Sequence, residues 1–364
     1  MAVTQLSNMQ TAATISAIEY YLPSGRLTNE MLAAQFPEWS VQKIEEKTGI
    51  ASRPIAAPDE CVSDMAVAAA QKLFNSKACL PEEIDFLLLC TQSPDYVLPT
   101  TACLVQDRLG IPTKCGALDF NLGCSGFVYG LGLAKGLIES GQARRVLLVT
   151  AEAYSKHIHP SDKSVRTLFG DAAAATLVIG HDNQGPAIGP FVYGTDGSGY
   201  PNLIVPAGGV RRPRSAETAC AVMDASGNRR AADNIFMNGV EIFNFTLAAV
   251  PNAVHALLER TGQTLADVDL FIFHQANSYM LEHLRRKLNV PSEHFFVALK
   301  DYGNTVSSTI PIALRNAFAQ GVLRPGALVM LVGFGVGYSW GATLVRWSEM
   351  FCRSSAECVG KTSP

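Results

Sequence analysis

The feature that most constrains this chain is an internal duplication at an offset of about 180 residues, half of its length of 364. Residues 80–90 read LPEEIDFLLLC, and residues 264–274 read TLADVDLFIFH. Each segment runs from a polar lead-in into a short strand that is apolar without interruption. Strands of this kind belong in a sheet that is covered on both faces.

The similarity continues beyond these two strands. Residues 120–141 and 300–321 each contain a Gly, a polar residue, a helix pattern with one apolar face, and a closing Gly. A closing Gly suits the left-handed C-terminal cap of a helix. Each helix pattern precedes another buried strand, at 144–153 and at 327–335. The order strand, helix, strand therefore holds in both copies.

The duplication predicts an α/β protein of two similar halves related by a pseudo-twofold axis. We expect the first half to occupy residues 1–184 and the second to occupy residues 185–364. The stretch 185–235 is rich in Gly, Pro and Arg, and we interpret it as an insertion and connection near the mouth of the active site.

Three polar residues take special positions in this duplicated pattern. Cys124 and Asn304 occupy equivalent positions, each after a Gly and just before a helix, while His274 ends the strand whose first-half counterpart ends at Cys90. Equivalent strand ends and helix starts converge on a pseudo-twofold axis. We therefore expect Cys124, His274 and Asn304 to meet.

Their chemistry suits nucleophilic catalysis. The start of a helix would stabilise a Cys124 thiolate. A histidine at a strand end can act as acid, base or donor near neutral pH, and an Asn amide is a neutral donor for an oxyanion. The alternatives are ordinary structural roles: Cys124 as a core thiol, His274 as a hydrogen-bonded core histidine, and Asn304 as a helix cap.

The composition of the chain argues against several other classes of protein. Apolar residues make up 48% of the chain, and the net charge is only −3, so no bulk field recruits nucleic acid or an anionic membrane. No apolar run approaches the ~20 residues of a membrane span, and no signal peptide is evident, so we expect a cytoplasmic protein. The nine cysteines include no CxxC pair, and neither disulfides nor a metal site is indicated.

The glycine-rich stretch GFGVGYSWG at 333–341 is not a dinucleotide motif. It lacks the GxGxxG spacing, and it ends a half rather than opening a strand–helix–strand unit. A loop whose backbone approaches the active site closely explains it better.

Taken together, the motifs identify a family. They occur in one order: Gly-Cys-Ser-Gly at 123–126, Phe-Gly-Asp at 169–171, His-Gln-Ala-Asn at 274–277, Gly-Asn-Thr at 303–305 and GFGVGYSWG at 333–341. The chain resembles β-ketoacyl-acyl carrier protein synthase III over roughly residues 12–348. The resemblance implies the five-layered αβαβα thiolase fold, a homodimer, and no cofactor or metal.

The resemblance also implies a mechanism and its partners. Cys124 accepts an acyl group from acyl-coenzyme A or another acyl thioester, and a malonyl thioester on acyl carrier protein then binds. His274 and Asn304 donate hydrogen bonds to the malonyl thioester carbonyl during decarboxylation. Backbone N–H groups of Cys124 and of the loop at Gly335 and Val336 form a second oxyanion hole.

Two more residues are assigned to the acyl pocket by resemblance. One of them is Phe169. Leu98 stands just before a Pro in DYVLPTTA, where the family places a residue that crosses the dimer interface and closes the partner's acyl pocket. Because Leu98 replaces the Phe that accompanies short primers, we expect medium or branched primers.

Several positions depart from the family pattern. Lys43 replaces a Trp that stacks on adenine, Lys163 replaces the Arg opposite it, Tyr279 replaces another Arg, and Val336 replaces a loop Gly. An adenine clamp is therefore not expected, although both lysines could contact phosphate.

Arg285, Arg286 and Lys287 form a candidate patch for an acidic carrier protein; the alternative is a solvated helix face. Other functions remain open: a relative that joins or transfers acyl chains in secondary metabolism, a subunit of a heterodimeric synthase, or a thiol redox protein.

Overall fold

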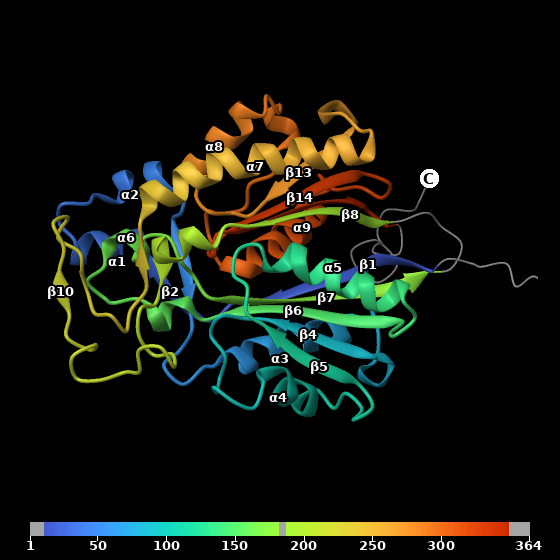
Figure 1. The fold of residues 1–364 in the computed structure, drawn as a ribbon, viewed down its shortest axis with the longest axis horizontal. Helices are drawn as coiled ribbons and strands as arrows, with labels where there is room; N and C mark the ends of the chain where they lie inside the picture. Colours follow the sequence, from blue (N-terminus) through green and yellow to red (C-terminus); the bar gives the residue numbers. More distant parts are fainter. Residues whose placement is uncertain (1–10, 182–186, 349–364) are drawn as a thin grey trace, which may run out of the picture.

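The structure is a computed structural model that describes residues 11–181 and 187–348. Two mixed sheets lie one above the other with helices between them and on both outer faces, which gives five layers (Figure 1). The six helices of these layers are α3 (Val62–Asn75), α4 (Thr101–Arg108), α5 (Gly126–Glu139), α7 (Gly239–Thr261), α8 (Ser278–Lys287) and α9 (Thr309–Ala319). Helices α5 and α9 form the central layer, α3 and α4 cover the first sheet, and α7 and α8 cover the second (Figure 1).

The first sheet has the strand order β1-β7-β6-β4-β5. Its strands are β1 (Ala12–Tyr21), β4 (Phe86–Cys90), β5 (Gly116–Phe120), β6 (Arg145–Glu152) and β7 (Ala172–His181). The second sheet has the order β13-β14-β15-β8. Its strands are β8 (Ile188–Thr195), β13 (Leu270–Phe273), β14 (Leu328–Gly335) and β15 (Ser339–Arg346).

The two sheets repeat one pattern of pairing. Strand β4 runs parallel to β6, and β13 runs parallel to β14. Strand β7 is antiparallel to both β6 and β1, and β15 is antiparallel to both β14 and β8. The predicted duplicated α/β fold is therefore confirmed.

The central helices are held by apolar burial. Leu131 of α5 and Ile310 of α9 are fully buried, and they pack in one cluster with Leu148 and Leu331 of the two sheets. Burying a side chain of this size contributes ~1.5–3 kcal/mol. Gly141 and Gly321 follow the central helices with φ angles of 77° and 69°, the left-handed caps that the sequence predicted.

Strand β8 corrects one detail of the sequence interpretation. Residues 188–195 were expected to belong to a connection, but they form the edge strand of the second sheet, antiparallel to β15. Gly189 and Pro190 obscured the strand pattern, because both residues are depleted from strand interiors. The expected boundary between the halves, at 184 and 185, lies outside the described residues.

Shorter elements join these strands and helices. They are β2 (Gly25–Thr28), α1 (Asn29–Gln35), α2 (Val41–Thr48), β3 (Ser52–Ile55), η1 (Pro81–Glu83), η2 (Tyr154–His157), α6 (Lys163–Arg166), η3 (Gly197–Asn202), β9 (Leu203–Ile204), β10 (Val222–Met223), β11 (Arg229–Arg230), β12 (Phe236–Met237), η4 (Leu265–Asp267), η5 (Ser292–His294) and η6 (Val306–Ser308). Among them, β2, α1, α2, α6 and β10 gather at one end of the molecule (Figure 1). No helix in the described ranges is both long enough and apolar enough to cross a bilayer.

Candidate active site

Cys124, His274 and Asn304 line one cavity of about 80 Å³. Their exposed fractions are 5%, 2% and 5%. Cys124 lies two residues before α5, His274 follows β13, and Asn304 lies two residues before η6, which leads into α9. The structure therefore brings together three residues that are up to 180 positions apart in the chain.

The loop at 333–341 approaches the nucleophile closely. A Cβ atom placed on Gly335 would lie 2.9 Å from the Cys124 sulfur, and one placed on Gly333 would lie 2.8 Å from the Cα atom of Ser125. Neither position has room for a side chain, so glycine is required at both. This agrees with the interpretation of the glycine-rich stretch as backbone packed against the site.

The resting state of Cys124 differs from the expectation. Burial and, secondarily, the Glu152 carboxylate raise the pKa of the Cys124 thiol to about 12. The backbone N–H groups of Val336 and of Cys124 itself act in the opposite direction and lower it. The expected thiolate-stabilising effect of the helix start is thus outweighed by desolvation, and the cysteine rests as a thiol.

Glu152 is a buried carboxyl group that the sequence analysis missed. It ends β6 with no exposed surface, accepts a hydrogen bond from the Gln92 N–H at 3.0 Å, and accepts another from the Ser307 hydroxyl at 2.9 Å. Burial raises the pKa of Glu152 to about 8, although both hydrogen bonds lower it. A polar residue directly after an apolar strand is the signal that singled out His274, and it also applies to Glu152.

We expect Glu152→Gln to increase the reactivity of Cys124 above pH 8. Glu152 ionises as pH rises through about 8, and its negative charge then disfavours the neighbouring thiolate. Each unit removed from the Cys124 pKa raises the thiolate fraction about tenfold, so we expect a ~3–10-fold faster alkylation by iodoacetamide at pH 9. Peptide mapping of Cys124 gives the rate, and the two proteins should match at pH 6.5. Equal rates at pH 9 would contradict this electrostatic coupling.

Asn304 is oriented by its own turn. Its Oδ1 atom accepts the Val306 N–H at 2.9 Å, so its Nδ2 atom faces the Nε2 atom of His274 at 3.5 Å. The Nδ1 atom of His274 lies 2.8 Å from the Thr309 hydroxyl. Burial lowers the pKa of His274 to about 3, against an opposing contribution from the Val306 carbonyl, so the imidazole is neutral near pH 7.

The Phe-Gly-Asp motif holds Asn304 from the other half of the molecule. Asn304 N–H donates to the Leu168 carbonyl at 2.9 Å, and Gly170 N–H donates to the Asn304 carbonyl at 3.0 Å. Asp171 in turn accepts hydrogen bonds from the backbone of Ala56 and Ser155. The motif therefore positions the backbone of Asn304.

The remaining walls of the Cys124 cavity are mostly apolar. They comprise Leu168, Phe169, Leu203, Met237, Gly239, Ile242, Ala276, Asn277, Met280, Phe334 and Gly335. Phe169 is one of these lining residues, and its assignment to the acyl pocket stays a prediction. Leu98 does not line the cavity of its own chain and is 79% exposed.

The basic residues proposed for phosphate or carrier-protein contact are largely engaged within the chain. Lys163 pairs with Glu38 at 2.7 Å, and Lys43 donates to the backbone carbonyl of the same Glu38. Arg285 donates to both carboxylate oxygens of Glu282 and to a backbone carbonyl.

Arg286 also pairs with Glu282, at 2.5 Å, while Lys287 is exposed. Glu282 lies one turn away on the same helix and neutralises part of the charge of Arg285 and Arg286. The candidate patch for an acidic carrier protein stays a prediction.

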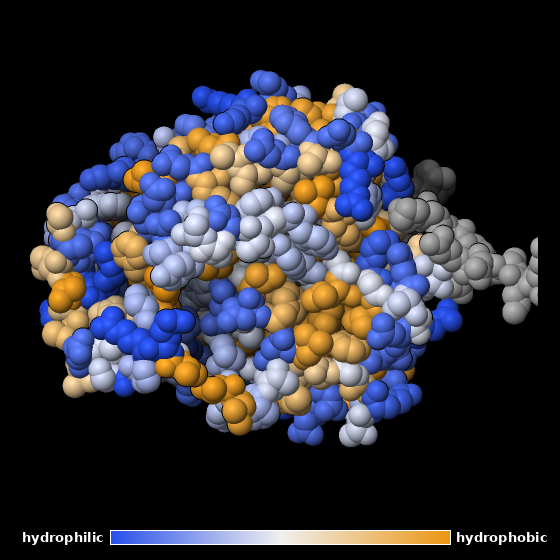
Figure 2. Space-filling view, in the orientation of Figure 1, coloured by the Kyte–Doolittle hydropathy of each residue, from blue (hydrophilic) through white to orange (hydrophobic). Residues whose placement is uncertain are grey.

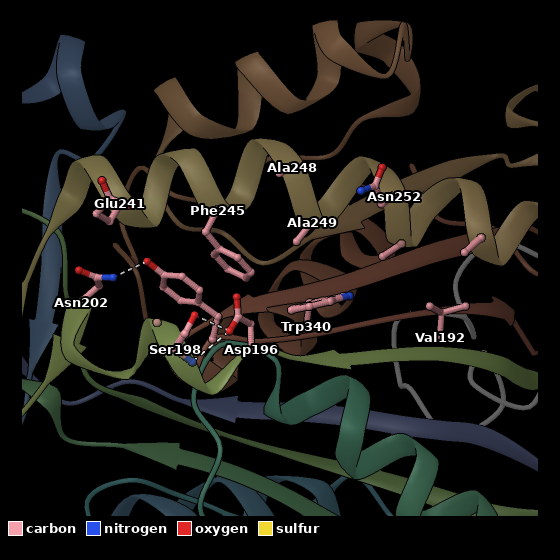
Figure 3. Close-up of a pocket in the computed structure, with 14 residues that line it drawn as sticks. Val192, Asp196, Ser198, Asn202, Glu241, Phe245, Ala248, Ala249, Asn252 and Trp340 are labelled. Carbon is pink, nitrogen blue, oxygen red and sulfur yellow. Dashed lines mark hydrogen bonds between the residues drawn. The ribbon is translucent and has the colours of Figure 1, made fainter.

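A second cavity, of about 750 Å³, lies between α7 and the strands β8 and β15 (Figure 3). Phe245 stacks on Tyr338 at 4.1 Å in this cavity, and Glu241 and Asp196 lie at its rim. Its described lining includes none of Cys124, His274 and Asn304. Within the described ranges, no cluster of three or more His, Cys, Asp or Glu side chains could hold a metal ion.

A duplicated αβαβα fold with a buried cysteine at a central helix start, facing a histidine and an asparagine, defines the class of thiolase-fold condensing enzymes. Two family models match, described as 3-oxoacyl-[acyl-carrier-protein] synthase III over residues 118–197 and its C-terminal part over residues 258–347. The β-ketoacyl-[acyl-carrier-protein] synthase III of Caldanaerobacter subterraneus subsp. tengcongensis is 37% identical, over 93% of this chain and 98% of that protein.

Solved structures agree. A 3-oxoacyl-(acyl-carrier-protein) synthase III is 54% identical with a TM-score of 0.91, over 92% of this chain and all of that one. A 3-oxoacyl-(acyl-carrier protein) synthase from Burkholderia xenovorans LB400 is 36% identical with a TM-score of 0.85, over 93% and 95% of the two chains. This chain belongs to the β-ketoacyl-acyl carrier protein synthase III family, which confirms the predicted fold and enzyme class.

Proposed function

We propose that this chain catalyses the decarboxylative Claisen condensation of an acyl primer with malonyl-acyl carrier protein, which yields a 3-oxoacyl product. The observation that supports it is the convergence of Cys124, His274 and Asn304 in one buried cavity beside the glycine loop. A thiol supplies the covalent acyl carrier, and the two side chains supply neutral donors for an enolate.

In the first half-reaction, the Cys124 sulfur attacks the carbonyl of the primer thioester. The thiol proton leaves with the departing thiol, and the acyl group remains on sulfur. Backbone N–H groups of Cys124 and Val336, which already approach the sulfur, are positioned to stabilise the oxyanion of this step.

In the second half-reaction, the malonyl thioester carbonyl lies between His274 and Asn304. Loss of CO2 leaves an enolate whose oxygen accepts hydrogen bonds from both side chains. The enolate carbon attacks the acyl-Cys124 carbonyl, and a carbon–carbon bond forms as the carbon–sulfur bond breaks. The Cys124 thiolate that departs takes a proton from solvent and returns to the resting thiol. A neutral His274 can donate without requiring protonation in the physiological pH range, which agrees with the lowered pKa of this residue.

We also propose that two copies of the chain associate through the β5 edge. In the described residues β5 pairs with β4 alone, and its Leu118 is 39% exposed. The nearby loop exposes Tyr96, Val97 and Leu98, and apolar side chains also gather over α5 (Figure 2). Exposed edges and apolar loops of this kind are usually covered by a partner.

Intact-protein mass spectrometry tests the proposal most directly. The protein is incubated with acetyl, branched and medium-chain thioesters of coenzyme A, pantetheine and acyl carrier protein, and then with malonyl-acyl carrier protein. We expect acylation of one cysteine, no large preference for coenzyme A over pantetheine, and release of the acyl group as a 3-oxoacyl product. A protein that remains unmodified by every thioester would refute the function.

Leu98→Phe is expected to restrict this acyl panel to short chains. Each methylene that the pocket accommodates contributes ~0.8 kcal/mol, about fourfold in kcat/KM. The larger Phe side chain at position 98 would fill part of the partner's pocket and remove that gain for longer primers. Val97→Phe is the matched control, because Val97 is the exposed neighbour of Leu98 on the same loop. An unchanged chain preference in Leu98→Phe would leave Leu98 as interface packing only.

A further inference from the structure

The proposed donor role of His274 requires its single proton to sit on Nε2. Burial lowers the pKa of His274 to about 3, so the ring carries one proton that can occupy either nitrogen. Only Nε2 faces Asn304 and the Cys124 cavity, while Nδ1 faces α9. If the proton sat on Nδ1, the Nε2 atom would carry an unshared electron pair, which repels the enolate oxygen.

Thr309, the first residue of α9, is the side-chain partner of Nδ1 at 2.8 Å. Its hydroxyl also lies 3.0 Å from the Val306 carbonyl, a group that the imidazole itself approaches closely enough for its pKa to be raised. The hydroxyl can therefore donate either to that carbonyl or to Nδ1. The Val306 carbonyl already accepts the backbone N–H of Thr309. The hydroxyl can therefore donate to Nδ1 without leaving that buried carbonyl unpaired.

The contact between Asn304 and His274 supports the same arrangement. Val306 N–H fixes the amide of Asn304, so Nδ2 faces Nε2. Their separation of 3.5 Å is long for an N–H···N hydrogen bond. This separation suits two donors that both point at one acceptor once the substrate binds, such as the thioester oxygen.

Val306 holds this arrangement in a strained backbone. Its φ angle is 56°, in the left-handed region that β-branched residues rarely occupy, and its side chain is fully buried. In this conformation its N–H orients Asn304 while its carbonyl accepts from Thr309. Strain of this kind is typically retained at functional sites.

We infer that Thr309 is a positioning residue that donates its hydroxyl hydrogen to His274 Nδ1 and thereby fixes the Nε2–H tautomer needed for decarboxylation. This inference rests on the proposed function. It adds a residue to the reaction that is not part of the described lining of the Cys124 cavity.

The test uses Thr309→Val, which keeps the branched shape and removes the hydroxyl, and Thr309→Ser, which keeps the hydroxyl. Loss of a group that fixes a catalytic histidine costs ~10²–10⁴-fold. We expect Thr309→Val to lose ~10²-fold or more in condensation and malonyl decarboxylation, with Cys124 self-acylation within a few-fold of wild type. Thr309→Ser should recover most of the lost rate.

Nitrogen-15 NMR of histidine-labelled protein gives a readout that a structural role would not move. We expect the ring of His274, assigned from the signals missing in His274→Gln, to show Nε2–H in wild type and Nδ1–H in Thr309→Val. An Nδ1–H tautomer in wild type overturns the inference, as does equal loss of self-acylation and condensation in Thr309→Val. Failure of the wild type to acylate Cys124 would instead refute the proposed function itself.

Discussion

Cys124→Ala should abolish the acyl-enzyme and lower condensation by ~10⁴-fold or more. Removing a nucleophile eliminates the covalent intermediate, and the losses measured for such changes are of this order. Incubation of the variant with an acyl thioester should add no mass to the intact protein. Wild type should gain one acyl group, and a peptide map should place that group on Cys124.

Cys90→Ala is the matched control for this variant. Cys90 is also a fully buried thiol near the start of α5, where it donates to the Leu122 carbonyl at 2.9 Å. It should still acylate at Cys124. Cys124→Ala should also retain slow decarboxylation of malonyl-acyl carrier protein, since His274 and Asn304 remain in place. An acyl group mapped to any other cysteine would overturn the central proposal.

The duplication could be predicted from the sequence because local residue patterns carry it. Continuous apolar strands and closing glycines survive in both copies, and their equivalence implies that Cys124, His274 and Asn304 share one end of the molecule. The apolar strands need no knowledge of their neighbours to be recognised, because a strand covered on both faces is apolar throughout. The topology of the two sheets then follows from the order of the elements.

Side-chain contacts and pKa values could not be predicted from the sequence, because they depend on which residues the fold brings close together. The pKa of Cys124 depends on its burial and on Glu152, which is 28 positions further along the chain but electrostatically coupled to it. The pairing of Arg285 and Arg286 with Glu282 required side-chain geometry, although the i,i+3 and i,i+4 spacing gave a hint. The contact between Thr309 and His274 depends on the left-handed backbone conformation at Val306. The sequence gives no sign of this conformation, because valine rarely adopts it.

The second large effect is expected for Asn304→Asp, which should acylate normally and condense ~10²–10³-fold more slowly. Aspartate is nearly the same size, so its carboxylate can still accept the Val306 N–H that orients Asn304. The group facing His274 Nε2 then becomes an acceptor with a negative charge instead of a donor. That charge repels the developing enolate, and removal of an oxyanion donor costs about this much.

The variant separates the two half-reactions because Asn304 is required only in the second. Burst acylation measured by intact mass should resemble wild type, while release of the acyl group by malonyl-acyl carrier protein should slow by the stated factor. Asn252→Asp on the exposed face of α7 introduces the same charge away from the Cys124 cavity and should leave both steps unchanged. Near-normal condensation by Asn304→Asp would exclude Asn304 as an enolate donor and leave His274 as the residue that stabilises the enolate.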